Sequence, residues 1–233
     1  MGRATAEHYA RLGAHVIMLA RSTDKLEQVA HGIVQNGGQA SYYAVDLSDA
    51  EAVAATAERI ESDLGTPDII INNAGAGRWL PLVETPPEDA RQMIELPYLA
   101  AFYVTRMFLP AMIARGHGHV ACVTSPASYI VWPNACGYIA ARHALRGFTE
   151  AMRREMRGTG VGVTLVVLGT VSSPYWSHNP GSREHLPATL PMLMPELTTE
   201  QAAKTIVGAI EKGKSRVVRP WFYRVLIALN LNG

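Results

Sequence analysis

The chain has 233 residues, of which 48% are hydrophobic and 18% are charged, and its formal net charge is +1. This length and apolar content suit one α/β domain with a substantial core. The near-neutral charge gives no reason to expect binding to nucleic acid or another polyanion. Neither of the two cysteines has the spacing of a metal site or a redox motif. We find no signal peptide and no apolar run of about 18 residues, so we expect a cytoplasmic protein.

Apolar periodicity predicts alternating helices and strands along the whole chain. Helical spacing of apolar residues predicts helices over residues 1–13, 23–35, 49–64, 88–113, 138–152 and 199–212. Short continuous apolar runs predict strands over 15–20, 40–45, 68–71, 119–124, 161–167 and 216–218. This alternation predicts the α/β class, in its doubly wound form, with helices on both faces of a parallel sheet.

Polar or small residues lie just after five of the predicted strands. They are Arg21, Asp46, Asn73, Ser125 and Gly169. In an open parallel sheet the carboxyl ends of the strands meet at one edge, and ligands bind in the crevice there. The sequence therefore predicts a nucleotide-sized ligand at that edge.

Three residues around the strand at 119–124 have chemistry that suits proton transfer. Ser125 follows this strand, and Tyr138 and Arg142 lie four positions apart near the start of the next helix. At that spacing the phenol and the guanidinium project from one face of the helix. A hydroxyl, a phenol and a fixed cation could together protonate or deprotonate a small oxygen substrate.

This spacing resembles that of the short-chain dehydrogenase/reductase family, which carries Ser, Tyr-x-x-x-Lys and an Asn one helix earlier. The stretch 72–75, Asn-Asn-Ala-Gly, matches the N-N-A-G signature of that family and follows an apolar strand. The resemblance covers nearly the whole chain and implies one Rossmann-type domain over residues 1–233. It also implies hydride transfer between a nicotinamide cofactor and a small alcohol or ketone. Tyr138 would move the proton, Ser125 would hold the substrate oxygen, and Arg142 would supply the cation.

The resemblance also implies where the cofactor binds. Arg21 follows Ala20, where family members that use NAD carry an acid, and an Arg can pair with a 2′-phosphate. We therefore expect NADP(H) to be preferred over NAD(H). The plainer interpretations are a surface Arg21 at a strand end and a turn-capping Asp46. The full set of implied cofactor contacts is Gly2, Arg21, Asp46, Leu47, Asn73, Ala74, Gly75, Tyr138, Arg142, Gly169 and Val171, with no metal ligand.

The chain departs from the family pattern at its catalytic positions and at its start. The Lys position holds Arg142, and the Asn position falls at Pro97, inside the predicted helix 88–113, where proline should produce a kink. Of the strand and glycine-rich turn that open the family fold, only the last glycine is present, as Gly2. We interpret the chain as truncated at its start, with a central strand missing from the sheet. We expect such a chain to bind dinucleotide weakly.

Two functions stay open at this point. One is a working oxidoreductase for a small, apolar substrate, and the alternative is a catalytically impaired relative that acts as a nucleotide-binding, scaffold or dimerisation protein. In either case we expect a homodimer or homotetramer. The apolar substrate is suggested by the residues expected to line the pocket, Ala127, Tyr129, Trp132, Tyr175, Trp176 and Leu193.

Two segments near the carboxyl end have no clear assignment from periodicity. Residues 172–197 are rich in Pro, Ser and His, which is typical of a mobile substrate loop, with plain disorder as the alternative. The tail 219–233 contains a strongly apolar run. It could be a core or dimer helix, a wall of the substrate pocket, or a helix lying on a membrane surface, but it is too short to span a bilayer.

Overall fold

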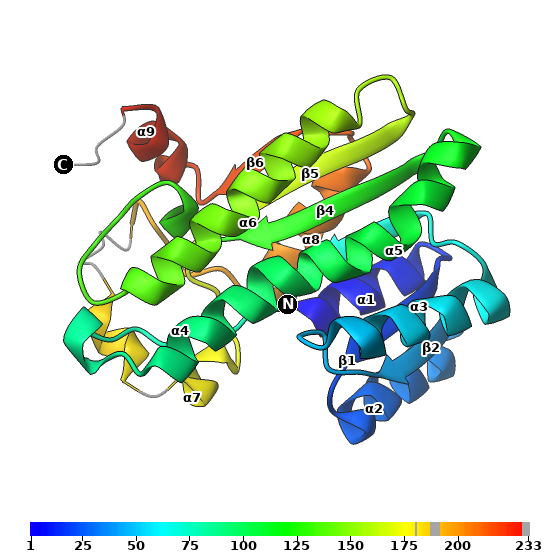
Figure 1. Cartoon of the computed structure of the whole chain (residues 1–233), viewed down its shortest axis with the longest axis horizontal. Coiled ribbons are helices and arrows are strands. Elements are labelled where there is room, and N and C mark those ends of the chain that lie inside the picture. The colour runs from blue at the N-terminus through cyan, green and yellow to red at the C-terminus, as the bar shows by residue number, and fades with distance from the viewer. Residues whose placement is uncertain (180, 187–191, 230–233) are drawn as a thin grey trace.

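Parallel strands with helices on both sides form the architecture of the chain (Figure 1), as the sequence predicted. The computed structural model describes residues 1–179, 181–186 and 192–229. Its strands are β1 (His15–Ala20), β2 (Gln39–Ala44), β3 (Ile69–Asn72), β4 (Gly118–Thr124), β5 (Val161–Leu168) and β6 (Arg216–Arg219). Its α-helices are α1 (Gly2–Arg11), α2 (Thr23–Gln35), α3 (Ala50–Leu64), α4 (Pro87–Ile94), α5 (Ala100–Arg115), α6 (Cys136–Glu155), α7 (Tyr175–His178), α8 (Thr199–Ile210) and α9 (Phe222–Ala228).

The strands form two parallel sheets rather than one. β1 pairs with β2, and the second sheet has the order β3-β4-β5-β6. Within the described part of the chain, β1 and β3 each have a strand partner on one side only. The gap predicted in the centre of the sheet is therefore present in the structure.

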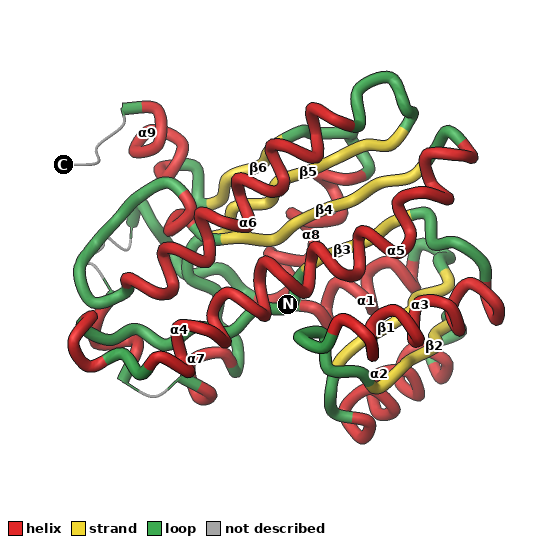
Figure 2. Tube along the Cα trace, viewed as in Figure 1, coloured by secondary structure: helices red, strands yellow, loops and turns green. Residues whose placement is uncertain are grey.

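Two apolar layers join the strands of both sheets to the helices that cover them. Figure 2 shows these helices on either side of the strands. One layer joins α3, α5 and α6 to the sheet, and its largest fully buried members include Ile60, Met112 and Leu145. The other lies under α1 and α8, which contact each other. Alternate residues of a strand face opposite sides, and β1 contributes to both layers, with Ile17 in the first and Val16 in the second. Side chains thus connect β1 to the larger sheet where backbone pairing does not.

The chain from Pro87 to Arg115 is one continuous helical stretch with an irregular centre. Pro97 is buried in a π-helical segment, Glu95–Leu99, between α4 and α5. A π turn absorbs the missing proline N–H without ending the helix, so the predicted distortion takes this form. By length and composition alone this stretch could cross a membrane, although Glu95 and Arg106 interrupt its apolar run. It packs on α3, β4 and α6, however, as a helix of a globular domain does.

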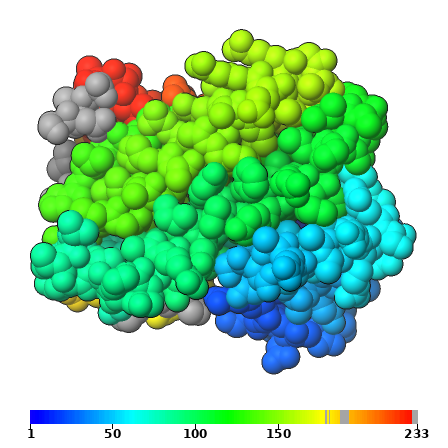
Figure 3. Space-filling model, viewed as in Figure 1, coloured from blue at the N-terminus to red at the C-terminus, as the bar shows by residue number. Residues whose placement is uncertain are grey.

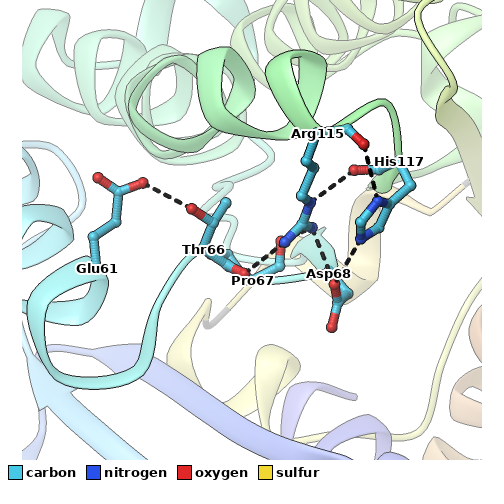
Figure 4. Close-up of polar contacts among 6 residues, drawn as sticks. All are labelled: Glu61, Thr66, Pro67, Asp68, Arg115 and His117. Carbon is cyan, nitrogen blue, oxygen red and sulfur yellow. Dashed lines mark hydrogen bonds and ion pairs between the residues drawn. The ribbon is translucent and has the colours of Figure 1, made fainter.

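Arg115 fastens the starts of β3 and β4 together, at the end of the sheet opposite the predicted site (Figure 4). Its guanidinium donates to the carbonyl oxygens of Thr66 at 2.9 Å, Pro67 at 2.7 Å and His117 at 2.9 Å. It also pairs with the Asp68 carboxylate at 3.1 Å. One planar fork thus satisfies carbonyls from two loops, a geometry that an ammonium group does not offer.

We expect Arg115→Lys to lower the free energy of unfolding by about 2–4 kcal/mol, because hydrogen bonds from charged groups each contribute ~1.5–3 kcal/mol. Urea unfolding followed by circular dichroism measures this. Arg11→Lys, at an exposed position of α1, is the matched control and should change stability by less than ~0.5 kcal/mol. Equal stability of the two variants would contradict the role given to Arg115.

Candidate functional site

Tyr138 and Arg142 form a buried pair at the start of α6. The helix begins at Cys136, so Tyr138 lies in its first turn and Arg142 one turn later. The exposed fractions of the two residues are 6% and 7%. The Arg142 Cζ atom lies 4.7 Å from the centroid of the Tyr138 ring, a cation–π contact. The two side chains share one face of the helix, as their spacing predicted.

Two glycines in the loop after β3 allow this pair to approach the backbone. A Cβ atom on Gly75 would lie 2.8 Å from Arg142 Nη2, and one on Gly77 would overlap the Tyr138 ring. A side chain at Gly77 would displace the Tyr138 ring, whereas one at Gly75 would push aside the end of the flexible Arg142 side chain. Gly75 was predicted from the sequence as a site residue, and Gly77 was not. The second glycine, two residues after Gly75, was the feature of the sequence that could have indicated this close approach.

The positive charge of Arg142 has no acidic partner among the described residues, and its Nε atom is buried without a hydrogen-bond acceptor. Burying an unpaired charge is costly, and such a group usually meets a partner or a ligand. The Tyr138 ring supplies only a part of that compensation. The guanidinium is therefore placed to receive an acceptor from outside the chain.

Buried polar side-chain atoms without a partner gather at one edge of the molecule. In the described part of the chain they are Asn73 Oδ1, Trp79 Nε1, Thr124 Oγ1, Trp132 Nε1, Arg142 Nε and Trp176 Nε1. All six lie at or after the carboxyl ends of β3, β4 and β5, or on α6. Buried polar groups in proteins are normally paired, so this concentration indicates a ligand site at the predicted edge.

Ser125 follows β4 directly and caps a short 3₁₀ helix, Pro126–Ser128. Its hydroxyl accepts a hydrogen bond from the Ala127 N–H at 3.3 Å. Its carbonyl accepts one from the Ser128 hydroxyl at 2.7 Å. Within the described residues its side chain makes no hydrogen bond to Tyr138. The structure thus places Ser125 at the expected edge, and its catalytic role stays a prediction.

Arg21 and Asp46 lie near each other after β1 and β2. Asp46 accepts hydrogen bonds from the Ser48 hydroxyl at 2.7 Å and from the Ser48 N–H at 3.0 Å. These bonds lower the pKa of the Asp46 carboxyl, and the charge of Arg21 lowers it further. Arg21 itself is exposed. Its guanidinium is thus open to an anionic group at this end of the site.

The remaining predicted contacts lie along the same edge. Gly2 opens α1, and a Cβ atom there would lie 3.1 Å from the Asn73 amide nitrogen. Gly169, after β5, is covered by Tyr223 and Pro220, which lie 2.7 Å and 3.0 Å from its Cβ position. Tyr223 belongs to α9, so the predicted tail packs against the core beside this turn, and residues 230–233 lie outside the described part of the chain. The other contacts named from the sequence, Leu47, Ala74 and Val171, also follow β2, β3 and β5.

An aromatic cluster adjoins Tyr138, and its central member, Trp79, was not predicted from the sequence. The Trp79 ring centroid lies 5.0 Å from that of Tyr138, 5.3 Å from that of Trp132 and 5.8 Å from that of Trp176. Its backbone N–H donates to the Ser182 hydroxyl at 3.0 Å. Nothing in the local sequence periodicity marks Trp79, because it lies in a loop.

Tyr175 connects this cluster to the Tyr138–Arg142 pair. Its hydroxyl donates to the Gly77 carbonyl at 2.9 Å. Burial raises the pKa of the Tyr175 phenol and Tyr138 raises it further, whereas Arg142 and the indole of Trp79 lower it. Tyr175 lies on α7, so this helix is bonded to the loop after β3 at the edge of the site.

Comparison with known proteins shows the family to which this chain belongs. The family model for short chain dehydrogenases matches residues 1–182, and the chain belongs to this family. An uncharacterized oxidoreductase of Mycobacterium tuberculosis is 35% identical over 237 residues, which cover 99% of this chain and 67% of that protein. The 1-deoxy-11-beta-hydroxypentalenate dehydrogenase of Streptomyces exfoliatus is 33% identical over 179 residues, 75% of this chain and 64% of that enzyme.

Solved structures agree with this assignment. A putative NAD(P) dependent gluconate 5-dehydrogenase from Beutenbergia cavernae, with bound NADP, has a TM-score of 0.81 and 31% identity, and the match covers 93% of this chain and 89% of that one. A metagenomic short-chain oxidoreductase in complex with NADP has a TM-score of 0.77 and 29% identity, with coverage of 93% and 90%. The resemblance noted in the sequence and the Rossmann-like fold are both confirmed.

We expect Gly77→Ala to lower kcat/KM for carbonyl reduction by about 100-fold, because displacing a reacting group by ~1 Å has an effect of that size. Steady-state oxidation of NADPH with a panel of small ketones measures it. Gly147→Ala is the control, since its added methyl would meet nothing within 4 Å on α6. That variant should keep full activity. Unchanged kcat/KM in Gly77→Ala would show that the Tyr138 ring is not held against this loop.

Proposed function

We propose that this chain is an oxidoreductase that transfers hydride between NADP(H) and the carbonyl or alcohol group of a small, apolar molecule. The observation that carries the proposal is the buried Tyr138–Arg142 pair within a set of polar atoms that lack partners. Membership of the short-chain dehydrogenase family supports the same reaction class. The NADP bound in the solved relatives supports the cofactor.

The residues at the sheet edge fit a dinucleotide. Asn73 Oδ1 and Thr124 Oγ1 can accept hydrogen bonds from hydroxyl or amide groups, and Arg142 can donate to hydroxyl oxygens. Gly75 leaves the backbone accessible, and Arg21 is open to a 2′-phosphate. A bound nicotinamide cofactor would supply the hydride. The chain would hold that cofactor through these groups and would handle the proton.

Tyr138 is the group we assign to proton transfer. Its hydroxyl would donate a proton to the substrate oxygen as that oxygen gains negative charge, and would take the proton back in the reverse direction. The Arg142 guanidinium lies over the Tyr138 ring, where it would face the negative charge that the phenol gains when it gives up the proton. A guanidinium does not release protons near neutral pH, so the phenolate must regain its proton from solvent. The Ser125 hydroxyl would hold the same substrate oxygen.

A second candidate function is nucleotide binding without turnover. It is favoured by Pro97, which is buried where the family carries an amide side chain and which cannot order a relay water. It is also favoured by the position of Arg142 over the ring of Tyr138. Binding of NADPH with no turnover on any small ketone would support this function over the first.

We expect Tyr138→Phe to lower kcat by at least ~100-fold, the lower range for general acid–base catalysis, while the Kd for NADPH changes by less than about threefold. The reason is that phenylalanine keeps the ring over which Arg142 lies and removes only the proton donor. Stopped-flow reduction and titration by fluorescence measure the two quantities. Substantial turnover by Tyr138→Phe would show that another group is the acid.

Arg21 is expected to set the cofactor preference. Arg21→Ala should raise the Kd for NADPH by about tenfold and leave the Kd for NADH unchanged, because a charge-assisted hydrogen bond contributes ~1.5–3 kcal/mol. Arg11→Ala, also exposed, is the control and should change neither value. An equal loss of affinity for both cofactors would place Arg21 away from the 2′-phosphate.

We further propose that two copies associate through α5 and α6, which form the middle of the face shown in Figure 3. A groove of about 320 Å³ runs between these helices. Its lining residues are Phe102, Thr105, Arg106, Leu109, Pro110, Ile113, Phe148, Ala151, Met152 and Glu155. The apolar side chains of Phe102 and Ile113 are 38% and 39% exposed. A two-fold axis would let Arg106 of each copy face Glu155 of the other, and neither residue has an ion-pair partner in the described part of the chain.

We expect the chain to sediment as a dimer or tetramer at micromolar concentration and Phe102→Asp to sediment as a smaller species, since the change buries a charge in an apolar interface. Val83→Asp is the control, because Val83 is 94% exposed and is not one of the residues that line this groove. Analytical ultracentrifugation measures the masses. A wild-type monomer, or the same assembly in both variants, would contradict the interface.

A further inference from the structure

We infer that helix α9 docks on the surface of a membrane that contains anionic lipids, with the outward face of the helix inserted among the headgroups. The inference concerns only this outward face, so it does not depend on the proposed function. α9 lies at the margin of the molecule, just beyond the end of β6 (Figure 1). Its sequence, Phe222–Ala228, is apolar except for one charged residue, Arg224.

α9 has one apolar face on the protein and another toward solvent. Tyr223 and Ile227, four residues apart, pack against the main core. Trp221, Val225 and Leu229, also four residues apart, form a stripe along another face and are 55%, 37% and 62% exposed. Single exposed apolar residues are normal, but a helix that is apolar all round is expected to be buried all round. The exposed stripe is therefore suited to a second apolar environment.

Positive charges flank this stripe. Arg219 precedes Trp221 by two residues, Arg224 lies on α9 itself, and both arginines are exposed. The stretch 212–229 contains no Asp or Glu, and its basic residues are Lys212, Lys214, Arg216, Arg219 and Arg224. No ion pair among the described residues involves any of these five. In a chain with a net charge of only +1, the stretch is thus a concentrated and uncompensated basic region.

An anionic lipid surface fits the stripe and the charges together. Basic residues beside an apolar stripe attract phosphate-bearing headgroups, while the stripe enters the boundary between headgroups and acyl chains. Tryptophan suits this boundary, because its ring is apolar and its N–H is polar. A protein partner would need acidic residues around an apolar groove, and the groove between α5 and α6 carries Arg106 as well as Glu155. With seven residues α9 is too short to cross a bilayer, so it would lie on the surface.

The test measures binding to vesicles of phosphatidylcholine alone and to vesicles of equal parts phosphatidylcholine and phosphatidylglycerol. Co-sedimentation gives the partition coefficient, and fluorescence reports the environment of Trp221, the most exposed of the tryptophans. Leu229→Asp places a charge in the stripe, and Leu12→Asp, at a position that is 61% exposed after α1, is its matched control. Arg219→Gln removes one flanking charge, with Arg11→Gln, also at an exposed position, as its control. Thermal melts check that each variant is folded.

We expect the wild type to bind the mixed vesicles about tenfold more tightly than phosphatidylcholine alone, with a blue shift of the Trp221 emission and weaker binding at high salt. Leu229→Asp should lose about tenfold, because the leucine side chain no longer enters an apolar environment. Arg219→Gln should lose about fivefold, the effect of one basic residue near an anionic surface. Both controls should bind as the wild type does.

Equal binding to the two kinds of vesicle, or an equal loss in Leu229→Asp and Leu12→Asp, would overturn the inference. Failure of the wild type to bind either kind of vesicle would overturn it as well. If, in that case, Leu229→Asp sedimented as a smaller species than the wild type, the stripe would be a contact between copies of the chain. None of these measurements uses turnover, so their outcome is separate from that of the proposed reaction.

Discussion

The positive charge of Arg142, buried on α6 without an acidic partner in the described chain, is the constraint on which the site depends. An unpaired buried charge costs free energy, so the surrounding structure has to offset it or a ligand has to. The Tyr138 ring offsets part of it through a contact of 4.7 Å. Glycines in the loop after β3 let the pair lie against the backbone. The reactive phenol is thereby held next to a permanent cation.

The fold supplies the rigidity that this arrangement needs. Strands β3, β4 and β5 pair along their length, and the loops that follow them converge on Tyr138. At the opposite end, Arg115 holds the starts of β3 and β4 together. The gap between β1 and β3 is bridged by two shared apolar layers rather than by backbone hydrogen bonds. The Tyr138 edge is thus built on the continuous four-stranded sheet, whereas Arg21 and Asp46 belong to the smaller one.

Local periodicity was sufficient to predict most helices and strands, because each depends on apolar residues at short spacing. It also placed Tyr138 and Arg142 on one face, since that relation is internal to α6. Gly77 and Trp79 were not found, because their importance comes from contact with Tyr138 about sixty residues later in the chain. The π turn at Pro97 was predicted only as a distortion, since the sequence shows the missing N–H but not how the backbone accommodates it. Helix α7 has four residues, too few to show a period.

The central claim is that a bound dinucleotide supplies the polar partner that the buried charge of Arg142 lacks. Thermal unfolding of the wild type and Arg142→Leu, each with and without millimolar NADPH, tests it directly. The account predicts that Arg142→Leu melts at a higher temperature than the wild type without NADPH, because an uncompensated charge is removed. It also predicts that NADPH stabilises the wild type and not the variant. A variant that is less stable without NADPH and gains as much from NADPH as the wild type would contradict the account.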